Sequence, residues 1–190
     1  MRRPVALIVL VAFAVALGVG QARATQAEAD VLARRLAAAR AATARYALNL
    51  ERAKADGYTI ITPMIPNMGY HFLNPKIQGF DVTRPPILVY VRRGNTWQLV
   101  AVEWVFPAKP DRDPLPGARY GSFGAACHYK DGSFVMADAE SACARVNLRT
   151  GAAFSFWHGP LVTLHVWLWY PNPDGVFAEL HPYLTPFNGE

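Results

Sequence analysis

The sequence predicts an α+β fold, in which a long N-terminal amphipathic helix precedes a mainly antiparallel β-sheet domain with Pro-rich loops. Residues 25–55 lack proline and are rich in Ala, Arg and Leu, which are strong helix formers. All prolines except Pro4 and all five tryptophans lie beyond residue 58, a composition typical of strands and ordered loops. Residues 161–170 are dominated by β-branched, aromatic and aliphatic side chains, as expected of a buried strand.

The first 24 residues carry the three parts of a secretory signal peptide. Arg2 and Arg3 give a basic head, residues 5–20 contain no charged or amide side chain, and Ala22-Arg23-Ala24 matches a small-residue cleavage site. A helix needs ~20 apolar residues to cross a bilayer, so this shorter run predicts cleavage and no stable membrane span afterwards. The mature protein is therefore expected to be secreted or periplasmic.

Cleavage also changes the charge balance. It removes three arginines and no acid from a chain with 19 basic and 14 acidic side chains. The remainder is close to electrical neutrality, so a nucleic acid is not expected as a partner.

Residues 25–57 are predicted to form one helix, because apolar side chains recur every three or four positions and Asp56-Gly57 supplies a stop signal. The shared face carries Leu32, Leu36, Ala39, Thr43, Tyr46 and Leu50. This face is expected to pack on a single α+β domain, residues 58–190. A homo-oligomer formed through the helix is the alternative.

The β-sheet domain is expected to contain a hairpin whose strands, residues 87–91 and 96–106, flank the turn residues Gly94-Asn95. A second turn is expected at residues 129–132 and a short helix at residues 137–144. Cys127 and Cys143 are the only cysteines. In an oxidising compartment such a pair most often forms a disulfide, worth roughly 3 kcal/mol for a short loop.

Two polar side chains interrupt apolar strands. Glu103 is the only charged residue between Gln98 and Phe106, and strand alternation places His165 in one row with Trp167. A carboxylate buried alone is costly, and an unpaired buried imidazole costs on the order of 1–3 kcal/mol. Glu103 is therefore expected to pair, to bind a cation or to hold a proton, and His165 is expected to need a partner.

Two further histidines complete a candidate metal site. His71 lies in a segment bounded by Gly69 and Pro75, and His158 precedes the strand of residues 161–170. Together with Glu103 and His165 they have the chemical types that bind one transition-metal ion, and the sequence does not distinguish Zn, Cu, Fe, Mn and Ni. Two interpretations remain open beside the metal: a buried Glu–His hydrogen bond that stabilises the core, and metal-free acid–base catalysis by the same groups.

Aromatic residues supply the candidate ligand pocket. Those expected to line it are Tyr70, Trp104, Trp167 and Trp169, although such residues more often form core. His128, next to Cys127, is expected at the surface near the disulfide.

Two segments carry a resemblance to other proteins. Met68–Pro75 (MGYHFLNP) and Leu164–Gly175 (LHVWLWYPNPDG) are similar to stretches in exported, uncharacterised bacterial proteins. The resemblance covers the chain from about residue 58 to the end and implies an exported bacterial protein. That group has no established function, so no catalytic role follows from the resemblance.

The function expected from these features is a small exported binding domain with an interior His/Glu site for a metal ion or a small ligand. The first alternative is a secreted enzyme, either metal-dependent or using a Glu/His acid–base pair. The second is a structural or interaction module in which a buried Glu–His pair only stabilises the fold.

Overall fold

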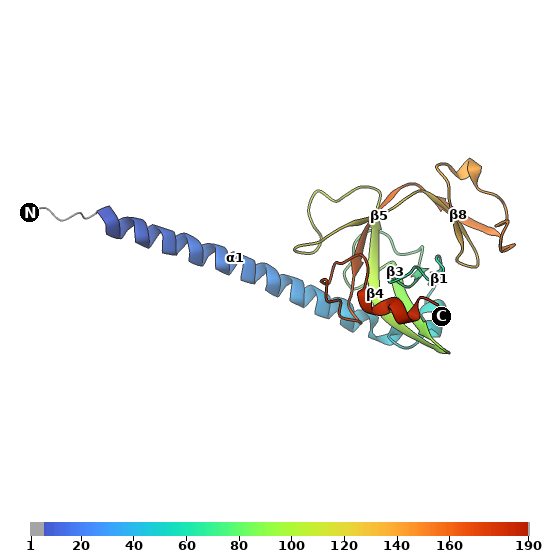
Figure 1. Ribbon diagram of the computed structural model, residues 1–190, viewed down its shortest axis with the longest axis horizontal. Helices are drawn as coiled ribbons and strands as arrows, with labels where there is room; N and C mark the ends of the chain where they lie inside the picture. The colour runs from blue at the N-terminus through green and yellow to red at the C-terminus, as the bar shows by residue number, and fades with distance from the viewer. Residues whose placement is uncertain (1–5, 190) are drawn as a thin grey trace, which may run out of the picture.

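The computed structural model describes residues 6–189, with side chains from residue 25 onward. The predicted signal peptide, residues 1–24, lies outside the part described with side chains, and export stays a prediction. Among the described residues, no helix combines the length and apolar character needed to cross a membrane. The fold is α+β, with antiparallel pairing throughout both of its sheets (Figure 1).

The N-terminal helical region consists of α1 (Ala6–Thr43), the 3-10 turn η1 (Ala44–Tyr46) and α2 (Leu50–Ala55). The prediction of one continuous helix to residue 55 is therefore wrong at residues 44–49. The shared face that the sequence predicts does pack on the rest of the chain. Leu32 and Leu36 contact the main hydrophobic cluster, and Ala39, Thr43, Tyr46 and Leu50 are buried.

Contacts with the sheet explain the interruption of the helix. The carbonyl oxygen of Tyr46 accepts a hydrogen bond from the Tyr90 hydroxyl at 2.9 Å, and that of Ala47 accepts the backbone N–H of Leu99 at 2.8 Å. The Ala47 carbonyl group is thus bonded to the sheet rather than along a helix, and the Tyr46 carbonyl group also accepts the backbone N–H of Asn49 at 3.2 Å, which closes a tight turn. Asn49 then starts α2, because its side chain accepts the backbone N–H of Arg52.

The larger sheet has six strands in the order β1-β2-β3-β4-β9-β5. Their bounds are Thr59–Ile60, Tyr70–Leu73, Ile87–Arg93, Thr96–Phe106, Leu161–Val166 and Gly121–Phe123, respectively. The predicted hairpin is confirmed as β3 and β4, with Gly94 at φ 57° in the turn.

β9 is shorter than the predicted strand of residues 161–170. Trp167 donates its backbone N–H to Val176 at 2.9 Å instead of continuing the ladder. The backbone N–H groups of Trp169 and Tyr170 both donate to the carbonyl oxygen of Val100, at 3.0 and 3.3 Å. Two donors on one acceptor do not fit the regular spacing of a β-ladder, so the strand ends at Val166.

The smaller sheet has three strands in the order β7-β6-β8. Their bounds are Phe134–Met136, Ala126–Tyr129 and Phe154–His158. The predicted disulfide is present between Cys127 in β6 and Cys143. The short helix expected at residues 137–144 is reduced to the 3-10 turn η2 (Glu140–Ala142) that precedes Cys143.

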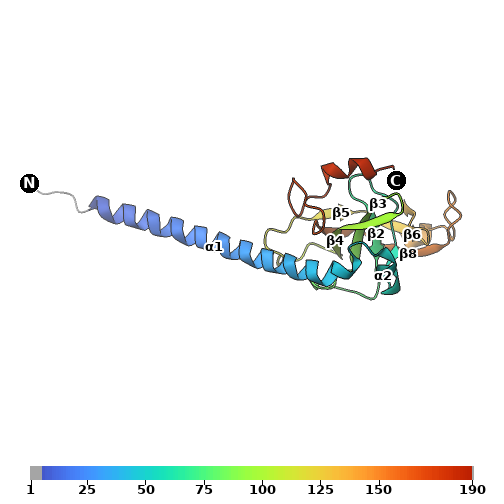
Figure 2. The same ribbon diagram turned by 90° about the horizontal axis from the view of Figure 1, so that it is seen from below.

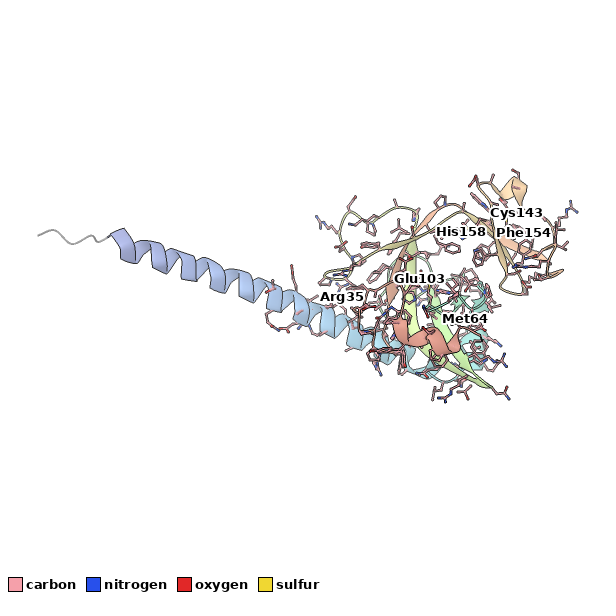
Figure 3. All side chains as sticks on the ribbon, viewed as in Figure 1. Arg35, Met64, Glu103, Cys143, Phe154 and His158 are labelled. Atoms are coloured by element: carbon pink, nitrogen blue, oxygen red, sulfur yellow. A yellow bond between two sulfur atoms is a disulfide. The ribbon has the colours of Figure 1, made fainter. Side chains whose placement is uncertain are left out.

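The larger sheet is covered on both faces, as Figure 2 shows with α1 and α2 on one side and the C-terminal turn η3 (Pro182–Phe187) on the other. The helix-side cluster includes Tyr90, Leu99 and Trp104, and the opposite cluster includes Val89 and Leu184. The side chains around these clusters are drawn in Figure 3. The opposite face, between the two sheets, is where the candidate site lies.

Candidate functional site

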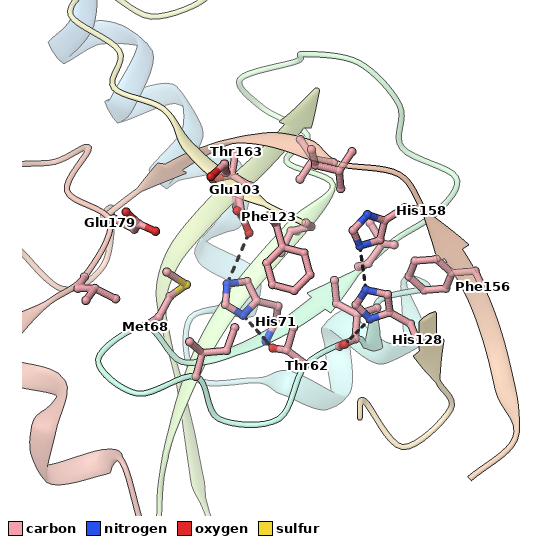
Figure 4. A pocket seen from close by; sticks show the side chains of 18 residues that line it. Thr62, Met68, His71, Glu103, Phe123, His128, Phe156, His158, Thr163 and Glu179 are labelled. Atoms are coloured by element: carbon pink, nitrogen blue, oxygen red, sulfur yellow. Dashed lines mark hydrogen bonds and ion pairs between the residues drawn. The ribbon is translucent and has the colours of Figure 1, made fainter. Parts of the chain in front are cut away.

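A cavity of about 440 Å³ is lined by one face of the larger sheet, by the smaller sheet and by the loop after β1 (Figure 4). Most of its wall is apolar. The apolar residues include Ile61, Ile65, Leu73, Ile87, Val105, Phe123, Phe156 and Leu161. Two polar groups interrupt this wall, each a pair of titratable side chains: Glu103 with His71, and His128 with His158. The other polar residues of the wall are Thr62, Ser122, Thr163 and the exposed Glu179.

Glu103 and His71 meet because of sheet register. Glu103 in β4 pairs with Ile87 of β3 and with His165 of β9, while His71 in β2 pairs with Val89 of β3. Paired residues of an antiparallel sheet share a face, and Ile87 and Val89 are two positions apart, so all these side chains emerge on the cavity side. The Nε2 atom of His71 lies 3.5 Å from Oε2 of Glu103.

Thr62 fixes the orientation of the His71 ring. The Thr62 hydroxyl oxygen lies 2.9 Å from Nδ1 of His71 and accepts the backbone N–H of His71 at 3.0 Å. Nε2 is thereby left to face the carboxyl group of Glu103 (Figure 4).

Burial shifts the proton equilibria of this pair in opposite directions. It raises the pKa of Glu103 from 4.5 to about 8, and it lowers the pKa of His71 from 6.5 to about 4. At pH 7 the carboxyl group therefore keeps its proton and the imidazole is neutral. The contact joins two uncharged groups and is not an ion pair.

His165 lies in the same group but makes no polar contact among the described residues. Both of its ring nitrogens are buried without a hydrogen-bond partner. Its ring centroid is 4.6 Å from that of Trp167 and 6.1 Å from that of His71. Burial, followed by the neighbouring His71, holds the pKa of His165 well below its ordinary value, so this ring is neutral at pH 7.

A second cavity of about 230 Å³ adjoins the first and is lined by His165, Arg119 and Glu179. Both cavities are lined by Met68, Glu103, Thr163 and Glu179. The carboxyl group of Glu103 therefore stands between the two spaces.

The second polar group is formed by His128 of β6 and His158 of β8. Ala126 pairs with His158 and lies two positions from His128, so the two histidines are diagonal neighbours on one face of the smaller sheet. Their Nε2 atoms are 3.0 Å apart. The His128 ring stacks on Phe156, with centroids 4.6 Å apart.

The expectation that His128 lies at the surface is wrong, because only 2% of it is exposed. Burial, opposed by the hydrogen bond to the Ile61 carbonyl group and assisted by the neighbouring His158, lowers the pKa of His128 from 6.5 to about 4. One sequence signal points to this burial: His128 lies directly after Cys127, and cysteine is among the residue types most often buried. In the structure both Cys127 and Tyr129, on either side of His128, are buried.

The structure brings together part of the predicted metal set. His71, Glu103 and His165 are gathered, whereas His158 bonds to His128 instead. Among the described residues, no three His, Cys, Asp or Glu side chains are arranged to hold one ion. A metal ion shared by the predicted residues stays a prediction.

The four aromatic residues expected to line the pocket lie elsewhere. Tyr70, Trp104 and Trp169 belong to the helix-side cluster, where the indole N–H of Trp169 donates to Thr43 at 3.0 Å. Trp167 packs in the opposite cluster and donates its indole N–H to the carbonyl oxygen of Ala178 at 2.7 Å. The aromatic residues on the cavity wall are Phe123 and Phe156 and the histidines.

No protein family, no curated protein and no solved structure matches this chain. The argument for function therefore rests on the cavity and on the chemistry of its two polar groups.

Proposed function

We propose that this chain is a small exported binding domain that holds a largely apolar small molecule in the 440 Å³ cavity, with a neutral polar group of that ligand at Glu103 and His71. The observation that carries the proposal is a mainly apolar cavity into which a buried carboxyl–imidazole pair points. Export rests on the signal-peptide pattern of residues 1–24.

The size and lining of the cavity support a small-molecule ligand. Ligand-binding cavities are typically about 300–1,000 Å³, lined mainly by apolar side chains, with a few polar groups that set orientation. Glu103 and His71 have this orienting role here, since they are 7% and 3% exposed and stand among aliphatic side chains.

The protonation state of the pair indicates which polar group would bind. At pH 7 Glu103 is protonated and His71 is neutral, so the site offers both donors and acceptors without a net charge. Next to Glu103 and His71 a charged head group would be buried without a counter-charge, which is costly, because the other carboxyl group of the cavity wall, that of Glu179, is exposed. An alcohol or a carbonyl group is therefore preferred over a carboxylate or an ammonium group.

A second candidate function is acid–base catalysis by the same pair. A carboxyl group with a pKa of about 8 beside an imidazole with a pKa of about 4 is the kind of separation that active sites use. The pair would then transfer a proton to or from the ligand that the cavity holds. Binding of a ligand is required in either case, so binding is the function to test first.

The test compares 1-decanol, decanoate and decyltrimethylammonium as probes with the full mature chain at pH 7. Binding is measured by chemical-shift changes of the methyl groups that line the cavity. We expect 1-decanol to bind most tightly. Glu103→Gln keeps a neutral donor and acceptor and should retain that preference, whereas Glu103→Leu removes both and should weaken 1-decanol binding. If none of the probes shifts the cavity methyl signals, binding is refuted and the Glu103–His71 contact is a feature of the core alone.

A matched pair of variants controls for the site of binding. Leu161 lines the cavity, so Leu161→Trp fills part of it and should reduce 1-decanol binding at least tenfold. Leu148 is 92% exposed, so Leu148→Trp makes the same chemical change away from the cavity and should leave binding intact. Equal binding by the two variants would place the probe elsewhere on the protein.

A further inference from the structure

The hydrogen bonds of His128 and His158 leave an unusual arrangement of nitrogen atoms. Nδ1 of His128 lies 2.7 Å from the carbonyl oxygen of Ile61, and Nδ1 of His158 lies 2.6 Å from that of Gly159. The two Nε2 atoms face each other at 3.0 Å (Figure 4). The pair thus makes three short contacts in a row, from a carbonyl oxygen through two rings to a second carbonyl oxygen.

Counting protons shows that two neutral rings do not satisfy these contacts. A carbonyl oxygen only accepts, so each Nδ1 must carry a proton. A neutral imidazole has one N–H, so neither Nε2 then has a proton to donate. Two lone pairs would face each other at 3.0 Å, and the arrangement needs one cation between the rings.

The surroundings favour a metal ion over a proton as that cation. His128 is buried, stacks on Phe156 and lies near Phe123 and Phe134. Among the described residues, neither ring of the pair makes an ion pair with a carboxylate. A proton between the two Nε2 atoms would complete this one contact alone, whereas a metal ion there can take further ligands from the adjoining cavity.

We propose that His128 and His158 form a two-imidazole site for a borderline transition-metal cation, Cu²⁺ or Zn²⁺, whose remaining coordination positions face the cavity. Metal–nitrogen bonds of ~2.0–2.1 Å at angles between square-planar and tetrahedral place two ligand atoms about 2.8–3.4 Å apart. The observed 3.0 Å separation of the Nε2 atoms lies within that interval.

The outer contacts of the two rings match those of metal ligands. A histidine that binds a metal through one nitrogen generally donates its other N–H to a carbonyl or carboxylate oxygen, which fixes the tautomer and the ring direction. Ile61 and Gly159 supply these carbonyl oxygens. Both come from the backbone, so the orientation of each ring is set by the fold itself.

This site differs from the set predicted from the sequence. It uses His128, which the predicted set omits, and it does not use His71, Glu103 or His165. It also does not depend on the proposed ligand, because both rings lie on the smaller sheet. A metal ion bound there would nevertheless face the cavity that the ligand would occupy.

The experiment uses the full mature chain, made without a polyhistidine tag and freed of metal by chelator dialysis. Calorimetric titration with ZnCl₂ and with CuSO₄ is expected to show one equivalent bound. His158 is only partly buried, so His158→Phe should be tolerated and should weaken binding at least tenfold. The matched variant His71→Gln should retain the affinity of the wild type, since His71 bonds to Glu103 and Thr62.

Nitrogen NMR of the wild-type histidines provides a test that needs no variant. On addition of Zn²⁺, the Nε2 signals of His128 and His158 should shift while those of His71 and His165 stay in place. The proposal is overturned if neither metal binds, if His158→Phe binds as tightly as the wild type, or if the shifts fall on His71 and His165. It is also overturned if the metal-free pair proves to share an extra proton at pH 7 and binds no metal.

Discussion

Replacing Glu103 by Gln tests the protonation state on which the proposed binding site depends. Gln has nearly the same shape and can donate a hydrogen bond, but it does not titrate. In the wild type, burial raises the pKa of Glu103 to about 8 in the folded chain, whereas an unfolded chain has the ordinary value of 4.5. Between these two values the folded state holds one more proton than the unfolded state.

The sign and size of the effect follow from this difference. Where the folded state holds the extra proton, stability falls as the pH rises, by about 1.4 kcal/mol per pH unit for one group. The buried histidines act in the opposite direction, because their lowered pKa values add stability as the pH rises towards 6.5. At pH 6.5 each histidine of the unfolded chain is still about half protonated, so the three buried histidines together add about 1.2 kcal/mol between pH 6.5 and 8. Glu103 removes about 1.7 kcal/mol over the same interval, which leaves a net loss of about 0.5 kcal/mol.

Urea unfolding at pH 6.5 and 8.0, followed by tryptophan fluorescence, measures this loss. The wild type should lose about 0.5 kcal/mol of unfolding free energy, while Glu103→Gln should gain about 1.2 kcal/mol over the same interval, a difference of about 1.7 kcal/mol. Glu140 is exposed, so Glu140→Gln is the matched control and should keep the wild-type loss. The reasoning is refuted if the unfolding free energies of the wild type and Glu103→Gln change equally between pH 6.5 and 8.0. It also fails if the carboxyl carbon signal of Glu103 in NMR shows an ionised group at pH 6.5.

Three further predictions concern the stability of the fold. Replacing Cys127 and Cys143 together by Ser should lower the unfolding free energy by roughly 3 kcal/mol, measured in urea against the oxidised wild type. Tyr90→Phe removes the donor to the carbonyl oxygen of Tyr46 and should cost about 1 kcal/mol, with faster amide hydrogen exchange in residues 44–49; unchanged exchange there would contradict the account of the helix break. Gly69→Ala should cost about 1–3 kcal/mol, because φ is 125° at this position and a Cβ atom would lie 2.7 Å from the carbonyl oxygen of Tyr90; wild-type thermal stability would contradict the expected strain.

The features of the fold that the sequence predicts are those encoded by neighbouring residues. The β3–β4 hairpin depends on two alternating strands and on Gly94-Asn95 between them, so a short stretch of sequence contains all the information. The stop of α2 at Asp56-Gly57 is of the same kind, since Gly57 adopts a φ of 102° that few other residues tolerate.

The errors occur where distant segments compete for backbone hydrogen bonds. The helix is interrupted because Tyr46 and Ala47 bond to residues of β3 and β4 some 44 or more positions away. The strand after Leu161 stops early because Trp167 finds its acceptor on the returning chain at Val176. Helix propensity and strand periodicity describe local preferences, and in both places a tertiary contact overrides them.

The same distinction between local and long-range information applies to the candidate site. A lone carboxyl group in an apolar strand is a local pattern, so Glu103 and His165 could be recognised as side chains in need of partners. That His71 reaches Glu103, however, depends on β3 lying between β2 and β4 with a particular register, and a shift of one residue would turn either side chain to the helix side. The burial of His128 could not be predicted from its neighbours in sequence. Its partners, Ile61 and His158, lie 67 and 30 residues away, and its own strand is too short to show a periodic pattern. Both polar groups of the cavity are therefore products of long-range pairing, which explains why the sequence identified three of their four side chains without assigning the pairs.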